Sequence, residues 1–164
     1  MLNDILFLQP GHLIRRAHQL AWAVFMDEAR EFELTPVQYS TLLVISFHPG
    51  IDATRLSELV SFDRATIGNV VERMEAKGLL KRKTGMKDRR TKKMFLTAQG
   101  KKVVARVKPL SPRVAERILE RLNARERNQL LQLLGKLVDI RQIVETAEPA
   151  SVDRQRRRAR QRSA

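Results

Sequence analysis

The sequence predicts a mainly α-helical protein with one small β-hairpin. Apolar residues recur at steps of three and four through most of the chain, and residues that cap helices stand before these runs. One short segment instead has a strand-like pattern on both sides of a basic turn. The 164 residues, 43% of them hydrophobic, are sufficient for a core, and we find no internal repeat.

The first two helices are predicted in the N-terminal third of the chain. Residues 11–32 carry apolar side chains at the helical period. Thr35, Pro36 and Gln38 then form a pattern close to a capping box, with proline at the first helical position. We therefore expect a second helix over residues 36–47.

Two short helices with a tight connection follow. Asp52 is a good N-cap for a third helix that ends near Ser61, and Asp63 caps a fourth helix. Gly78 stands where a left-handed C-cap residue would end that helix. Two such helices form a helix-turn-helix pattern. The residues expected to be buried in the fourth helix are Ile67, Val70, Val71 and Met74.

The rest of the folded part is predicted to be a hairpin and two helices. Residues 79–83 and 93–97 are typical of short strands. Thr97 then caps a long helix that continues through Pro109 and Pro112, and these prolines should kink it. Asn123 with Glu126 resembles another capping box, opening a last helix whose apolar residues extend to Val144.

The chain is strongly basic. It has 32 Lys and Arg against 18 Asp and Glu, a formal net charge of +14 at pH 7. Residues 151–164 hold only part of this excess, so the folded part is basic as well. Such a charge indicates a polyanionic partner, most often nucleic acid, while RNA, DNA and acidic lipid all stay open on charge alone.

Several classes of protein are excluded by composition and motifs. There is no cysteine for disulfides or thiolate sites, no apolar segment of transmembrane length and no secretory signal, so we expect a cytoplasmic protein that does not bind membranes. There is no His-Glu-x-x-His motif or glycine-rich phosphate loop, and the three histidines lack metal-site spacing. We expect no enzymatic activity, cofactor or metal.

The order of helix, helix, strand, basic turn and strand suits DNA, because a helix fits the major groove and an arginine-tipped hairpin fits the narrower minor groove. On the polar side of the fourth helix, Arg64, Thr66 and Asn69 suit base edges, Gly68 permits close approach and Arg73 suits a phosphate. The alternative is an ordinary solvated helix face.

The turn favours the DNA interpretation. Asp88 is out of place in a loop meant only to attract phosphate, and it would be explained if it held a neighbouring arginine so that Arg90 points into the groove. The alternative is a solvated basic turn. The candidate DNA-binding residues are Arg64, Ala65, Thr66, Gly68, Asn69, Arg73, Lys87, Asp88, Arg89 and Arg90.

These segments together resemble the MarR (multiple antibiotic resistance regulator) family. The resemblance covers residues 11–146 and depends on Asp63-Arg64-Ala65-Thr66, the run from Val70 to Leu80, Asp88-Arg89-Arg90, and Leu96-Thr97-Ala98-Gln99-Gly100. It implies a winged helix-turn-helix with an all-helical dimerisation region, with Arg90 as the wing arginine and Asp88 as its partner. The arginine-rich tail departs from the family pattern.

The terminal helices are expected to form a homodimer, because each carries an apolar stripe too wide for a solitary surface helix. A palindromic operator would follow, with half-sites about 34 to 36 Å apart. The last residues have almost nothing to bury and should be disordered unless bound. The predicted organisation is a dimerisation helix (1–34), a winged helix-turn-helix DNA-binding domain (35–98), dimerisation helices (99–147) and the tail (148–164).

A small-molecule effector site is predicted near the junction of the first two helices. His18 lies on the apolar side of the first helix, and an aromatic carboxylate or related anion would suit the cationic and aromatic groups around it. The alternative is a histidine satisfied in the core. The segment from Gly11 to Gln19 resembles the branch of the family that controls aromatic acid catabolism. The candidate effector residues are Arg15, Arg16, His18, Trp22, Tyr39 and Phe47.

The sequence therefore predicts a sequence-specific transcriptional regulator, a repressor released by an aromatic carboxylate or its coenzyme A thioester. The alternative is a nucleoid-type or RNA-binding structural protein, which the arginine-rich tail would suit and which would not respond to a ligand.

Overall fold

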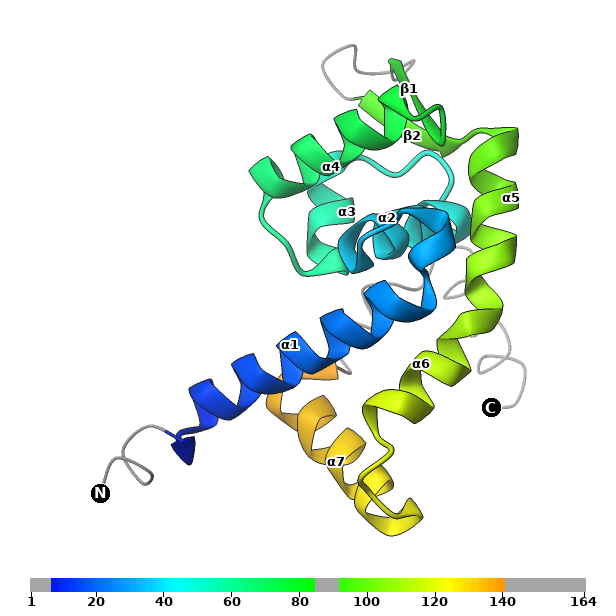
Figure 1. Ribbon diagram of the computed structural model, residues 1–164. Coiled ribbons are helices and arrows are strands. Elements are labelled where there is room, and N and C mark those ends of the chain that lie inside the picture. The colour runs from blue at the N-terminus through cyan, green and yellow to red at the C-terminus, as the bar shows by residue number, and fades with distance from the viewer. Residues whose placement is uncertain (1–6, 85–91, 141–164) are drawn as a thin grey trace, which may run out of the picture. The chain divides into compact units, whose positions relative to one another are not determined.

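The computed structural model describes residues 7–84 and 92–140, in two compact units that divide after Glu120 and are described separately (Figure 1). The first unit holds, in chain order, α1 (Pro10–Glu28), the 3-10 turn η2 (Arg30–Phe32), α2 (Pro36–Phe47), α3 (Ala53–Val60), α4 (Arg64–Ala76), β1 (Leu80–Thr84), β2 (Lys92–Leu96), α5 (Ala98–Val107), the 3-10 turn η3 (Lys108–Leu110) and α6 (Ser111–Ile118). The second unit holds α7 (Ala124–Leu137). This is the predicted winged helix-turn-helix architecture.

The helices of the first unit begin where the sequence places N-caps. The side chains of Thr35, Asp52, Asp63 and Thr97 each accept a hydrogen bond from the backbone N–H three residues on, which satisfies one of the free donors of the first turn. At Thr35 the reciprocal bond from Gln38 completes a capping box. The predicted starts of α2, α3, α4 and α5 are therefore confirmed.

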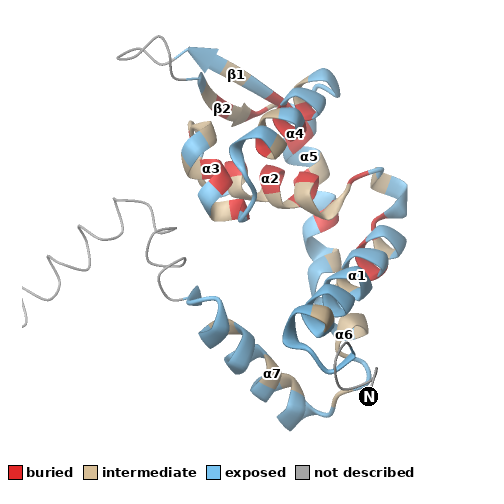
Figure 2. Cartoon of the chain, turned by 90° about the vertical axis from the view of Figure 1, so that its left-hand side faces the viewer, coloured by how far each residue is buried: buried red, intermediate tan, exposed pale blue. Residues whose placement is uncertain are grey.

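The core of the first unit is formed around α2, which packs against α3, α4, α5 and β2. Figure 2 shows the buried residues gathered in this region. Leu42, Leu56, Ile67 and Met74 are fully buried. The four residues expected to face inward from α4 are all buried, because they recur at three- and four-residue steps on one side of the helix.

The hairpin consists of two antiparallel strands whose register runs from Leu80 opposite Leu96 to Thr84 opposite Lys92. Ile51, just before α3, forms a bridge to Met94 and joins the hairpin to the helix-turn-helix. The strands lie within one residue of their predicted positions, the usual uncertainty of element ends. The turn at residues 85–91 lies outside the described residues.

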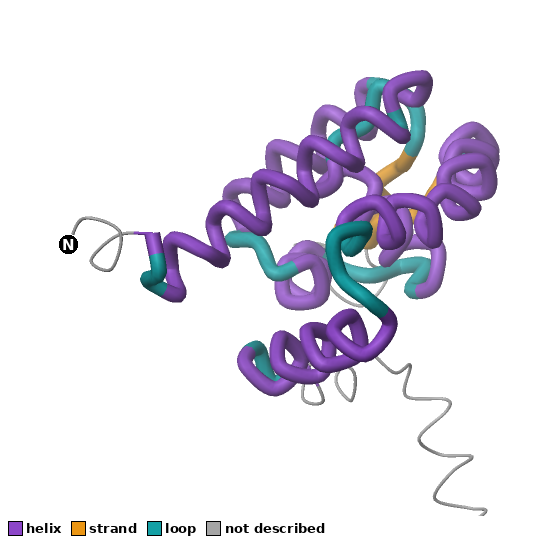
Figure 3. The backbone as a smooth tube through the Cα atoms, turned by 60° about the horizontal axis from the view of Figure 1, so that its bottom comes forward, coloured by secondary structure: helices purple, strands orange, loops and turns teal. Residues whose placement is uncertain are grey.

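Two helices differ from the prediction. The first ends at Glu28 and continues as a 3-10 turn that closes on Glu33 with a left-handed backbone, φ 51°. The long helix expected after Thr97 is interrupted more sharply than a kink, because Pro109 and Pro112 have no N–H to donate and crowd the preceding turn. Its two halves, α5 and α6, are joined by η3 (Figure 1), and Figure 3 shows how far helix predominates over strand in the described part of the chain.

A close backbone contact fixes the start of α5 on the hairpin. A side-chain carbon added at Gly100 would lie 1.9 Å from the carbonyl oxygen of Leu79. Thr97 strengthens this joint: its backbone N–H donates to the Leu79 carbonyl at 3.1 Å and its hydroxyl donates to the Gly78 carbonyl at 2.6 Å. Only glycine at position 100 permits this approach.

In the second unit, α7 begins with the predicted capping box between Asn123 and Glu126. It ends at Leu137, with Val138 as its C-cap and then Asp139 with φ 49°, so it is shorter than the predicted helix. Val144 lies outside the described residues. None of the residues of α7 is buried. Across residues 7–84 and 92–140, no helix has the length and apolar character needed to cross a membrane.

Candidate DNA-binding surface and effector pocket

The N-terminus of α4 is fixed by two hydrogen bonds between Asp63 and Thr66. The Asp63 carboxylate accepts from the Thr66 backbone N–H at 2.8 Å and from its hydroxyl at 2.6 Å. These bonds lower the pKa of Asp63, the hydroxyl bond most, because they favour the charged carboxylate. The hydroxyl of Thr66, expected to read base edges, is therefore already engaged within the helix.

The other predicted contacts on α4 lie at its surface. Arg64, Ala65, Asn69 and Arg73 are exposed, and Gly68 is half-buried. A side-chain carbon added at Gly68 would meet no atom within 4 Å, so its free side faces open space. These residues form one accessible strip of the helix, opposite its buried face. Lys87, Asp88, Arg89 and Arg90 lie outside the described residues, so their role stays a prediction.

An ion pair ties α4 to the first strand of the hairpin. The Glu75 carboxylate accepts from the backbone N–H of Arg82 at 2.9 Å and from its Nε at 2.7 Å, and its Oε2 lies 2.6 Å from Arg82 Nη2 in a salt bridge. The side-chain hydrogen bond from Arg82 lowers the pKa of Glu75. One carboxylate oxygen is thus taken by the Arg82 side chain and the other by its backbone, so Glu75 links α4 directly to β1.

A second contact ties α3 to the other strand. Asp52, the N-cap of α3, accepts from the Arg55 backbone N–H at 3.0 Å and from Lys93 Nζ at 3.0 Å. The backbone bond from Arg55 and then the bond from Lys93 lower the pKa of Asp52. Sequence analysis identified Asp52 as a cap but did not predict its pair with Lys93 or the pair of Glu75 with Arg82. Each of these pairs joins a helix to a strand, and no local sequence pattern encodes how those elements pack.

A separate cavity of about 200 Å³ lies among α1, α2, α5 and α6. Its polar atoms are few, and no charged residue lines it. Tyr39 is buried beside it, with its ring stacked on Phe25 at 5.6 Å between centroids and its hydroxyl 3.2 Å from Ser111 Oγ. The lining residues are Phe25, Pro36, Tyr39, Ser40, Val107, Leu110, Ser111, Val114, Ala115 and Ile118.

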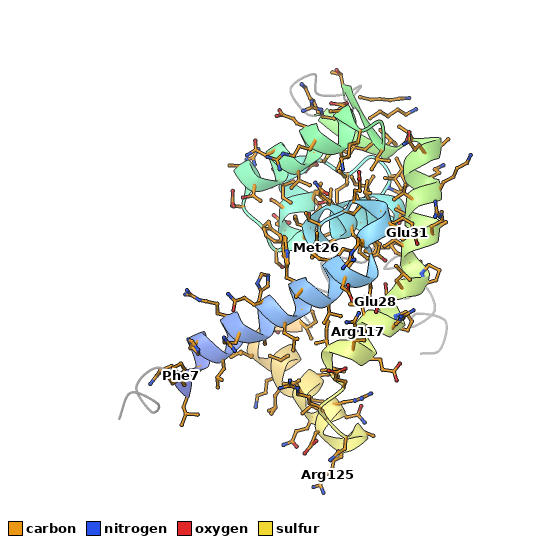
Figure 4. The ribbon with its side chains drawn as sticks, viewed as in Figure 1. Phe7, Met26, Glu28, Glu31, Arg117 and Arg125 are labelled. Carbon is orange, nitrogen blue, oxygen red and sulfur yellow. The ribbon has the colours of Figure 1, made fainter. Side chains whose placement is uncertain are left out.

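One wall of this cavity is held by ion pairs between α1 and α6. The side chain of Glu28 is only 5% exposed and bonds Arg113 Nε at 2.9 Å and Arg117 Nη1 at 2.5 Å. Arg117 also bonds Asp27 at 2.8 Å and lowers its pKa. Figure 4 shows Glu28 and Arg117 facing each other from the two helices.

Of the six candidate effector residues, only Tyr39 lines this cavity. His18 is exposed, with its ring 6.2 Å from that of Trp22, so it is not a core histidine. His18 precedes Phe25 by about two helical turns and therefore lies on the same side of α1, about 10 Å away. Arg15 and Arg16 are exposed as well.

Phe47 does not lie across from His18 together with Tyr39, as the sequence suggested. It is 59% exposed at the end of α2, with Lys108 Nζ 5.3 Å from its ring centroid. The reason is helical geometry, because eight residues along α2 rotate the side chain by roughly 80° relative to Tyr39. Among the described residues, no three His, Cys, Asp or Glu side chains gather as a metal site would require.

Comparison with known proteins agrees with this geometry. The MarR family model matches residues 34–92, from the loop before α2 to the start of β2. The transcriptional repressor NicR of Pseudomonas putida is 34% identical over 131 residues, which are 80% of this chain and 83% of NicR. The chain belongs to the MarR family. Like its relatives in that family, it is a DNA-binding transcriptional regulator.

Solved structures of this family share its fold. The structure describing regulation of DNA binding of Bordetella bronchiseptica BpsR by 6-hydroxynicotinic acid is 30% identical, with a TM-score of 0.76 over 80% of this chain and 94% of BpsR. The transcriptional repressor CouR bound to a 23-mer DNA duplex is 26% identical, with a TM-score of 0.75 over 84% of this chain and 97% of CouR. These structures thus match at least four fifths of this MarR-family chain.

Proposed function

We propose that this MarR-family protein is a cytoplasmic, non-enzymatic repressor that binds a palindromic operator as a homodimer and is released by a small aromatic acid or its coenzyme A thioester. The observation that carries the ligand response is the apolar cavity beside Tyr39, which adjoins the helix-turn-helix through α2 and the hairpin-linked helix α5. A ligand that changes this cavity acts directly on the elements that carry the DNA-binding surface.

The chemistry of the cavity supports an aromatic ring as its occupant. Its volume of about 200 Å³ accommodates a ligand of one ring, and its lining is apolar apart from the hydroxyls of Tyr39, Ser40 and Ser111. These hydroxyls suit a ring hydroxyl or ring nitrogen. BpsR, whose DNA binding is regulated by 6-hydroxynicotinic acid, supplies an example of such a ligand in a relative.

The acid or thioester group would extend from the cavity along α1. His18 and Trp22 lie one to two turns from Phe25 on the same side of α1, and Arg15 adds positive charge near them. Arg16 is rotated by roughly 180° from Phe25 and lies on the other side of α1. An exposed cationic group suits a carboxylate or a thioester arm. We therefore assign Tyr39 to the ring and His18, Trp22 and Arg15 to the acid or thioester, whereas helical geometry separates Arg16 and Phe47 from the cavity.

Homodimerisation is supported by the apolar side chains of the terminal helices. Leu13, Ile14 and Leu20 of α1 are each about half exposed, and α7 exposes Leu131 and Leu137 by more than half. An isolated helix of 14 residues, the length of α7, is marginal in water without an apolar partner. A second copy of the chain provides one on both helices, and a twofold dimer presents two recognition helices to two half-sites.

The experiment is a titration of the protein against a duplex from its own promoter and against random duplex, with and without 6-hydroxynicotinic acid and related aromatic acids. A repressor prefers its operator by roughly 10³ or more, whereas a nucleoid-type or RNA-binding structural protein binds both duplexes alike. A ligand that favours the DNA-incompetent form about 100-fold weakens operator binding by about 2.7 kcal/mol. Equal affinity for operator and random duplex would overturn the proposal.

Two matched substitutions test the cavity. Ala115→Phe fills it from α6, and Ala105→Phe adds the same ring to an exposed position of α5 that does not line it. We expect Ala115→Phe to bind the operator normally and to lose the ligand response, and Ala105→Phe to retain both. His18→Ala and Arg15→Ala should bind DNA normally but respond less to the acid. A normal response in all of these variants would place the effector elsewhere.

A further inference from the structure

A larger hollow, of about 610 Å³, lies between α3, α4 and the hairpin strands. It is separate from the effector cavity, and the two share no lining residue. The start of α3 forms one wall, one side of α4 forms the second, and Arg82 of β1 with Lys92 and Met94 of β2 form the third. The DNA-binding elements of the fold therefore surround one open concavity.

The charges around this hollow are predominantly positive. Arg55, Arg64, Arg82 and Lys92 line it. In the described part of the chain, neither Arg64 nor Lys92 forms a salt bridge. Four cations from four different elements therefore surround an open space with room for an anionic ligand.

The two acids that line the hollow already have partners. Asp52 is bonded to the backbone of Arg55 and to Lys93, and Glu58 pairs with Arg55 at 2.9 Å. These pairs leave the hollow with more positive than negative charge, which favours an anion over a cation. Asp52 and Glu58 would repel a polyanion only weakly, because a positive charge lies close to each carboxylate.

Arg82 is held in a fixed position within this hollow. Glu75 accepts hydrogen bonds from its backbone N–H and Nε and lies 2.6 Å from Nη2 in a salt bridge, while Nη1 is 3.9 Å from Glu72, beyond hydrogen-bond distance. The Glu75 pair therefore orients the guanidinium and leaves Nη1 with donor capacity. An arginine that is already ordered loses little side-chain entropy when it binds a ligand.

The position of the hollow identifies the anion. In the proposed DNA complex, α4 enters a major groove and the hairpin reaches the adjacent minor groove. Two adjacent grooves are separated by one sugar-phosphate backbone, so that backbone must pass between α4 and the hairpin. The hollow occupies this interval, and Gly68 on its α4 wall has no side chain to obstruct it.

We propose that this hollow is a binding site for the phosphodiester backbone between the two grooves, with Arg55 and Lys92 as phosphate ligands and Arg82 as a ligand pre-oriented by Glu75. The site deepens the proposed function, on which it rests, and adds three residues that sequence analysis did not assign to DNA. Since they bind phosphate, they contribute affinity without selecting a base sequence.

The test measures affinity for operator and random duplex over a range of salt concentrations. Each lost phosphate contact should reduce the slope of log K against log salt by about 0.9. Arg55→Met and Lys92→Met are expected to weaken binding to both duplexes by about tenfold each and to flatten both slopes. The matched controls are Arg30→Met, which also breaks an exposed ion pair three residues apart, and Lys102→Met on α5. Unchanged slopes of log K against log salt for Arg55→Met and Lys92→Met would overturn the proposal.

A second measurement separates backbone phosphate from a free anion. Neutral methylphosphonate links, placed one at a time between the major-groove half-site and the adjacent minor groove, should weaken the wild-type protein but not Lys92→Met any further. If inorganic phosphate binds the free protein and is lost in these variants while every DNA slope is unchanged, the hollow is a small-anion site and the proposal is wrong. Operator preference over random duplex, measured in the same titrations, tests the proposed function independently.

Discussion

Glu28→Gln is expected to loosen α1 from α6 although the two side chains have nearly the same shape. In the native chain one carboxylate oxygen accepts a hydrogen bond from Arg117 and the other lies 2.9 Å from Arg113 Nε in a salt bridge. Glutamine keeps one acceptor and turns an NH₂ group toward the other guanidinium, so one of these two charged contacts is lost. Such bonds contribute about 1.5 to 3 kcal/mol, and we take the lower end because both arginines reach solvent.

A loss of about 1.5 kcal/mol lowers the melting temperature of a chain of this size by about 3 to 6 °C. The assay is thermal unfolding followed by circular dichroism at fixed protein concentration, because a dimer's melting temperature depends on concentration. The control is Glu31→Gln, which breaks the exposed pair with Arg106 and should change little. If Glu28→Gln has the same melting temperature as the wild-type protein, the buried carboxylate does not hold α1 and α6 together.

Four further predictions follow from the same structure. Gly100→Ala forces a methyl group against the Leu79 carbonyl and should destabilise the fold by about 1 to 3 kcal/mol, whereas Gly11→Ala, with no atom within 4 Å, should not; equal melting temperatures would contradict the close contact. Arg90→Ala should leave melting unchanged and weaken operator binding by about 1 to 3 kcal/mol in a gel-shift titration; wild-type binding would refute its assignment to the wing. Because Arg82 lowers the pKa of Glu75 below its ordinary 4.5, the pair stabilises the fold above that pH and the contribution is lost as the pH falls through the lowered value; Glu75→Gln should therefore melt below wild type at pH 7, with a difference that shrinks in acid. Deleting residues 151–164 should weaken specific and random duplex binding by similar factors and flatten the salt slope, and an unchanged slope would exclude the tail as a phosphate contact.

Local signals in the sequence were sufficient for most of the helices. Thr35, Asp52, Asp63 and Thr97 each mark a helix start through hydrogen bonds to residues within one turn, so nothing distant is needed to interpret them. The inward side of α4 follows from periodicity for the same reason. Capping and helical periodicity involve only residues close together in the sequence, so the sequence pattern alone is enough to predict them.

The candidate sites were less predictable because they depend on packing between elements. The pairs Glu75 with Arg82 and Asp52 with Lys93 join residues that no periodicity relates. The proposed effector cavity is another case: Tyr39 was identified, but α5 and α6 supply half of its lining, and their arrangement depends on the break at η3. Wing residue Arg90 was assigned from motif alone and stays a prediction.

The contact between Gly100 and Leu79 has a mechanical consequence. Leu79 directly precedes β1, and Gly100 lies in the first turn of α5. Because these two residues are in close contact, β1 and α5 cannot slide past each other without a steric clash. We expect them to move together, with the hairpin at one end of α5 and Val107, which lines the cavity beside Tyr39, at the other. The chain is most easily bent at η3, where Pro109 and Pro112 cannot donate backbone hydrogen bonds. A displacement of Val107 is then expected to reach the hairpin over the length of α5, about 15 Å at 1.5 Å per residue.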